Sequence, residues 1–124
     1  MKLVLALFAL MLAIGFATLW IWRLSPAQAP CAAREIAQER APGGRTQADV
    51  FEVSCGASVS THVALRPAGA AEEARSDVFI AAGSVPVRVR WISAREVAVD
   101  SPAARVLAAE ARWRDVVVRT GPPR

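Results

Sequence analysis

Residues 59–66 read Val-Ser-Thr-His-Val-Ala-Leu-Arg, and this stretch decides the class of fold. A β-branched or apolar residue occurs at every second position, with polar or small residues between them. A period of two places alternate side chains on opposite faces of an extended chain, so the stretch predicts a β-strand buried on one face. Residues 85–91, which read Val-Pro-Val-Arg-Val-Arg-Trp, alternate in the same way.

Further strands are predicted on both sides of this stretch. Four short runs rich in Val, Phe and Ile predict strands over residues 47–54, 77–81, 95–100 and 113–119. Pro and Gly punctuate the chain between the runs and favour turns over crossover helices. The sequence therefore predicts a mainly β fold, with a small antiparallel sheet or sandwich of about six strands.

Two segments of this domain are less regular. Residues 103–112 are rich in Ala, and Ser-Pro at 101–102 suits a helix start, so a short helix and a strand both stay open there. Residues 66–77 have no apolar face for a core and predict a mobile loop. The expected core residues are large and apolar: Phe51, Val63, Phe79 and Trp91.

An apolar segment precedes the domain. Residues 3–22 are interrupted only by Gly15 and Thr18. Twenty helical residues reach about 30 Å, the thickness of the hydrocarbon core of a bilayer. We therefore expect a transmembrane signal-anchor helix over residues 1–24, in contact with the lipid bilayer through residues 3–22. The expected membrane-interface anchors stand at its end: Trp20, Trp22 and Arg23.

A cleaved secretory signal is the alternative to an anchor. Ala-Gln-Ala at 27–29 offers a small-x-small cleavage site, and cleavage there would release a soluble periplasmic protein. The apolar stretch is longer than the roughly 7 to 15 residues usual in such signals, and Pro30 would follow the cut. We therefore expect an uncleaved anchor, a linker over residues 25–33 and a β-domain over residues 34–120.

Two patterns disagree about the side of the membrane on which the β-domain lies. Lys2 precedes the apolar segment, and four arginines follow it: Arg23, Arg34, Arg40 and Arg45. By the positive-inside rule this distribution would keep the domain in the cytoplasm. The very short amino-terminal tail and the even number of cysteines favour export, and export is our expectation.

Cys31 and Cys55 are the two cysteines of the chain, and both follow the apolar segment. Two cysteines in a small exported domain predict a disulfide. The bridge would close a loop of about 25 residues and stabilise the fold by about 3 kcal/mol. The alternative is a small thiol-dependent hydrolase with Cys55 as nucleophile and His62 as its base. No Asp or Asn is indicated near His62 to orient it, so we expect this side chain to be exposed.

The charge distribution argues against a nucleic-acid partner. Of the 15 Lys and Arg, Lys2 and Arg23 flank the apolar segment, and the other 13 are interspersed with 11 Asp and Glu. Nucleic-acid interfaces need clustered cations. One His, two separated Cys and scattered carboxylates form no metal-ligand motif, and no Gly-rich phosphate loop occurs, so we expect no cofactor.

Residues 51–58, which read Phe-Glu-Val-Ser-Cys-Gly-Ala-Ser, are the centre of a family resemblance. With Pro-Gly-Gly at 42–44 and Val-Arg-Trp at 89–91, the chain resembles a family of small uncharacterised bacterial membrane-anchored or exported proteins with a Phe-Glu-x-x-Cys-Gly-Ala-(Ser/Thr) motif. The resemblance spans residues 31–119. The usual pattern of the family has Pro-Asp-Gly at 42–44 and Asn in place of Asp77. The resemblance implies an exported domain and no assigned activity.

We therefore expect a membrane-anchored protein whose exported, non-catalytic β-domain is a binding or accessory module of the cell envelope. Besides the bilayer, its expected partner is a protein or an envelope component. The expected location is the bacterial inner membrane, as a single-pass protein with the carboxy-terminal domain on the periplasmic face.

Overall fold

The computed structural model describes residues 1–24, 31–102 and 105–123. Its helix α1 spans Lys2–Leu24, as expected for residues 1–24. Residues 2–23 form a helix long and apolar enough to cross a membrane, and an 18-residue stretch of it has a mean hydropathy of 2.5. Every side chain of residues 1–23 is exposed, so no other described part of the chain buries this apolar surface.

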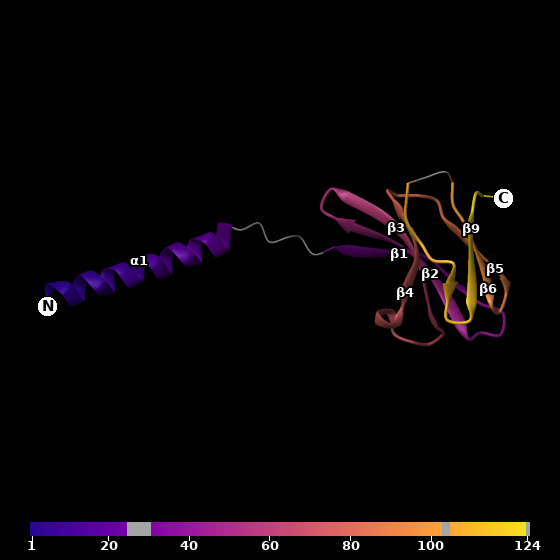
Figure 1. The fold of residues 1–124 in the computed structure, drawn as a ribbon, viewed down its shortest axis with the longest axis horizontal. Coiled ribbons are helices and arrows are strands. Elements are labelled where there is room, and N and C mark those ends of the chain that lie inside the picture. Colours follow the sequence, from indigo (N-terminus) through magenta and orange to yellow (C-terminus); the bar gives the residue numbers. More distant parts are fainter. Residues whose placement is uncertain (25–30, 103–104, 124) are drawn as a thin grey trace.

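Nine strands follow in the described residues and form two sheets (Figure 1). The strands are β1 (Ala32–Arg40), β2 (Thr46–Cys55), β3 (Ser58–Pro67), β4 (Ser76–Ala82), β5 (Arg88–Ser93), β6 (Glu96–Asp100), β7 (Val106–Ala109), β8 (Arg112–Trp113) and β9 (Val116–Gly121). The five-stranded sheet has the order β1-β2-β3-β4-β7, and the four-stranded sheet has the order β5-β6-β9-β8. Neighbouring strands run antiparallel except β6 and β9. The predicted mainly β, mostly antiparallel fold is confirmed.

The core lies between the two sheets. Val63 and Phe79 are fully buried there, and the cluster unites residues of both sheets. Trp91 on β5 packs against the cluster while partly buried, and its Nε1–H donates to the carbonyl of Glu39 on β1 at 3.0 Å. This bond joins one sheet to the other. Phe51 is also buried, but it lies outside this cluster.

The alternation over residues 59–66 located β3, and the runs rich in Val, Phe and Ile located β2, β4 and β6, all within two residues of their ends. Neither pattern predicted the edge strand β1. All nine residues of β1 are exposed, so its sequence carries no apolar alternation. Its hydrogen bonds to β2 make it a strand. The expected linker over residues 25–33 therefore ends inside β1, and its residues 25–30 lie outside the described part of the chain.

The carboxy-terminal third differs in three places from the sequence-based expectations. Of the segment 103–112, residues 103–104 are not described, and Val106–Ala109 form β7 beside β4, so the strand is the correct alternative. Pairing with the free edge of β4 outweighs the helix propensity of Ala, which is below about 1 kcal/mol per residue. Residues 85–87 precede β5, because Pro86 has no N–H for the ladder. Residues 113–119 are divided between β8 and β9 by a turn at Arg114, whose φ is 53°.

Candidate functional site

The outer face of the five-stranded sheet, which points away from the core, carries most of the organised polar side chains. Along β2 and β3 the core residues alternate with outer-face residues, as pleating requires. Phe51 pairs in register with His62, so both rings lie on the outer face. Ser60 is two residues before His62 on β3 and shares this face.

A β-bulge brings an acidic residue to the same place. The register of β3 with β4 pairs Val63 with Phe79 and then Ala64 with Asp77, so Val78 is the extra residue. The bulge changes the alternation of β4, and Asp77 therefore reaches the outer face although Phe79, two residues later, lies in the core. Strict alternation would have placed Asp77 and Phe79 on one face.

Ser60, His62 and Asp77 form a continuous hydrogen-bonded array. Ser60 Oγ lies 2.8 Å from His62 Nε2, and His62 Nδ1 lies 3.3 Å from Asp77 Oδ2. An ionised carboxylate accepts hydrogen bonds only, so Nδ1 of the ring carries the proton that it donates to Asp77. In the neutral ring Nε2 is then an acceptor, and the hydroxyl of Ser60 donates to it.

Phe51 fixes the ring of His62 from one side. The two ring centroids are 5.1 Å apart, and the ring planes are inclined by 23°. The guanidinium carbon of Arg75 lies 3.8 Å from the centroid of Phe51, at cation-π distance. Phe51 is therefore covered by Arg75 and His62 and not by the core between the sheets.

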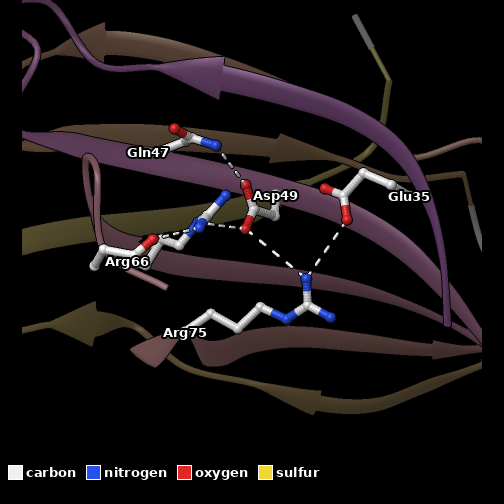
Figure 2. Close-up of polar contacts among 6 residues, drawn as sticks. Glu35, Gln47, Asp49, Arg66 and Arg75 are labelled. Atoms are coloured by element: carbon white, nitrogen blue, oxygen red, sulfur yellow. Dashed lines mark hydrogen bonds and ion pairs between the residues drawn. The ribbon is translucent and has the colours of Figure 1, made fainter. Parts of the chain in front are cut away.

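Arg75 is in turn held by a buried carboxylate, as Figure 2 shows. Asp49 on β2 is completely buried; its Oδ2 lies 2.8 Å from Nε of Arg66 and 3.9 Å from Nη1 of Arg75. Gln47 donates to Asp49 Oδ1 at 2.9 Å, and Arg75 Nη1 also lies 3.5 Å from Glu35 Oε2. The network spans β1, β2, β3 and the segment before β4.

The segment between β3 and β4 closes over this network. Arg66 Nη1 donates to the carbonyl of Ala70 at 2.6 Å, and a short 3-10 helix, Glu72–Ala74, leads to Arg75. The predicted loop over residues 66–77 is shorter in the structure: Arg66 belongs to β3 and is buried, Asp77 belongs to β4, and Glu72 and Glu73 between them are exposed. An open depression of about 440 Å³ lies beside Arg75, lined by Phe51, Val53, His62, Glu72, Glu73, Arg75 and Asp77.

A second carboxylate is stabilised on the opposite side of β2. The hydroxyl of Ser84 donates to Glu52 Oε1, and Arg34 Nη2 donates to Glu52 Oε2 at 3.0 Å. These bonds, that from Ser84 first, hold the pKa of Glu52 below its usual value. In the described part of the chain, no three His, Cys, Asp or Glu side chains are grouped to hold a metal ion.

Two groups of sequence-predicted residues are not part of the array of Ser60, His62 and Asp77. Cys31 and Cys55 form a disulfide that joins the chain before β1 to the end of β2. Cys55 therefore has no thiol, and the alternative hydrolase with Cys55 as nucleophile lacks its reacting atom. The expected membrane anchors lie exposed at the end of α1: Trp20, Trp22 and Arg23.

His62 differs most from expectation. Its side chain is only 14% exposed and has Asp77 as an orienting partner, so the expectation of an exposed histidine without a nearby acid is wrong. Sequence reasoning missed Ser60, Asp77 and Arg75. Ser60 was detectable as the neighbour of His62 on one face of a predicted strand. Asp77 was not, because the bulge that turns it depends on strand pairing.

The fold and the site together define a two-sheet β-sandwich domain that follows an apolar helix and carries a Ser-His-Asp array on one outer face. Comparison of the chain with protein-family models, with curated proteins and with solved structures finds no match. The family resemblance drawn from residues 51–58 stays a prediction.

Proposed function

We propose that this protein is a single-pass membrane protein whose β-sandwich is a binding or accessory module of the cell envelope. The observation that carries the proposal is the exposed surface of α1. Its large apolar side chains in residues 3–22 are each at least 53% exposed. Leaving apolar surface in water costs about 25 cal/mol per Å², and a bilayer removes this cost.

The disulfide supports a location outside the cytoplasm. Bridges persist in oxidising compartments and are rare where thiols are kept reduced. The bridge between Cys31 and Cys55 joins the residue before β1 to the end of β2 and so closes the first hairpin. This supports the periplasmic face of a bacterial inner membrane as the location of the domain, against the arginine count.

The outer face of the five-stranded sheet is the proposed binding surface. Buried ion pairs cost desolvation energy and add little to stability compared with an apolar replacement. Asp49, Arg66 and Arg75 are such a network, and they hold Phe51 and His62 in the wall of the depression. A preorganised wall of this kind suits a protein or envelope-component ligand.

The test uses the full chain expressed in bacteria. Carbonate extraction of membranes, intact mass, and protease digestion of spheroplasts should give an uncleaved, carbonate-resistant protein whose β-domain is digested from outside. Thiol blocking in intact cells should label neither cysteine. A carbonate-soluble protein shortened after Ala29 would instead be a released periplasmic protein. A protected domain with two labelled thiols would be cytoplasmic, contrary to the proposal.

A further inference from the structure

The array on the outer face has the connectivity of an activated nucleophile. Such sites need a hydroxyl within about 2.6 to 3.2 Å of a base, and a third group that orients the base. Ser60 Oγ lies 2.8 Å from His62 Nε2, and Asp77 holds Nδ1 at 3.3 Å. The proton positions derived above make Ser60 the donor and His62 the acceptor, which is the direction that deprotonation of Ser60 requires.

We propose that Ser60 is a nucleophile that accepts acyl groups from activated esters, with His62 as its base and Asp77 as a positioning residue. This activity goes beyond the anchoring and binding proposed above and does not depend on the location of the domain. It would replace the expectation that the domain is non-catalytic.

The surroundings of His62 supply the rigidity that this chemistry needs. The ring stacks on Phe51, Phe51 lies under Arg75, and Arg75 reaches the buried carboxylate of Asp49. A base that is already oriented avoids losing conformational freedom in the transition state. Burying the charge of Asp49 costs free energy, and the contacts that this buried carboxylate makes hold His62 in position.

The reaction is an acyl transfer. Ser60 Oγ attacks the ester carbonyl carbon and forms the new C–O bond while its proton moves to His62 Nε2. The bond from carbon to the leaving oxygen then breaks, and Nε2 returns the proton to that oxygen, giving an alcohol and an acyl-Ser60. Water attacks the acyl-Ser60 with His62 again as base, which releases a carboxylic acid and restores the hydroxyl.

The position of Ser60 restricts the substrate. Ser60 lies in β3 between two paired strands, with Val53 and Ala82 as its register partners. The backbone around Ser60 therefore takes part in the hydrogen bonding of the sheet. Each missing oxyanion donor costs about 100-fold to 1,000-fold in rate, so activated esters are expected to react and amides are not. Phe51 and Val53 offer an apolar wall to a short acyl chain, and Glu72 and Glu73 disfavour anionic ones.

The experiment treats the full chain in detergent with a fluorophosphonate reporter and with p-nitrophenyl butyrate. The reporter forms an Oγ–P bond as the P–F bond breaks, and the proton leaves with fluoride. Intact mass and peptide mapping should place one adduct on Ser60. Ser60→Ala should abolish it. Ser58→Ala is the matched control: Ser58 is an exposed residue of the same strand that donates to the carbonyl of Cys55, and its loss should leave labelling unchanged.

Two further variants separate the roles of the base and of its partner. His62→Gln should slow labelling by about 100-fold or more. Asp77→Asn should slow it by about 10-fold or more, because an amide can donate to Nδ1 and leave the proton on Nε2. Asp77→Glu keeps the carboxylate and should recover most of the rate. A merely structural role would change the melting temperature of both Asp77 variants without this rescue.

Two outcomes overturn the proposal. Folded wild-type protein, judged by its melting transition, that forms no adduct shows that Ser60 only hydrogen-bonds the ring. Equal labelling of Ser60→Ala shows that another residue reacts. Neither outcome affects the membrane proposal, which extraction and protease digestion test separately.

Discussion

Asp49 Oδ2 lies 2.8 Å from Nε of Arg66 on the neighbouring strand, and the carboxylate is completely buried on the side of the sheet that faces away from the core. The two atoms meet as an ion pair outside hydrogen-bond geometry. Gln47 and Arg75 complete the surroundings of the carboxylate. This pair connects the stability of the fold to the candidate site, because Arg75 also covers Phe51.

Removing one partner of this pair should be strongly destabilising. Asp49→Ala leaves Arg66 buried without its counter-ion, and we expect a loss of about 3 to 5 kcal/mol in the free energy of unfolding, measured by urea titration. The matched control is Asp115→Ala, since the Asp115–Arg95 pair is 3.6 Å long with side chains 70% and 78% exposed. That variant should lose less than about 1 kcal/mol. Equal losses would mean that Asp49 is accessible to water.

Reduction of the disulfide should lower stability without changing the topology. In the chain-entropy description, a bridge closing a loop of this size contributes about 3 kcal/mol. The double variant Cys31→Ser with Cys55→Ser should therefore melt at a lower temperature than the oxidised protein. Reducing agent should lower the melting temperature of the wild type and leave the double variant unchanged. An unchanged wild type would show that the bridge is absent in solution.

Trp91 should contribute strongly to the stability of the packing between the two sheets. Trp91→Phe keeps most of the apolar contact but loses the bond to the carbonyl of Glu39, and we expect a loss of about 1 kcal/mol. Trp91→Ala removes the packing as well and should cost about 3 to 5 kcal/mol at most, since the side chain is only partly buried. Chemical denaturation of the two variants gives both values. Similar losses for both would assign the effect to the hydrogen bond alone.

Glu52 should make stability depend on acid. Its pKa is lowered in the folded protein, first by the hydroxyl of Ser84 and then by Arg34. A lowered folded pKa gives stability that is present above the unfolded pKa, about 4.3, and is lost as the pH falls through the folded value. Glu52→Gln should therefore differ from wild type at pH 7 and converge with it in acid.

Ser84→Ala tests the cause of this effect. This variant removes the largest contribution to the lowered pKa of Glu52. The pH at which the stability contributed by Glu52 is lost should therefore move to a higher value. Urea titrations at several pH values measure it. A difference between wild type and Glu52→Gln that is constant down to acid pH would mean that Glu52 is not stabilised in its charged form.

A strand was predictable from the sequence where its own residues show an alternating or apolar pattern. Residues 59–66 alternate, and they lie in β3, the middle strand of the five-stranded sheet. β1 was missed because an exposed edge strand has no apolar face to reveal it. Phe51 was expected in the core on the evidence of its size, but it lies on the outer face, covered by an arginine and a histidine.

Residues 3–22 and the alternation over residues 59–66 determined, from the sequence by itself, that an apolar helix precedes a mainly β domain. Both signals are periodicities within a single element, and burial against lipid or core selects them directly. Only the tertiary structure decided that Asp77 meets Ser60 and His62. Their meeting depends on the register of β3 with β4 and on the bulge at Val78, which arise from hydrogen bonds between strands and leave no periodic trace in either strand.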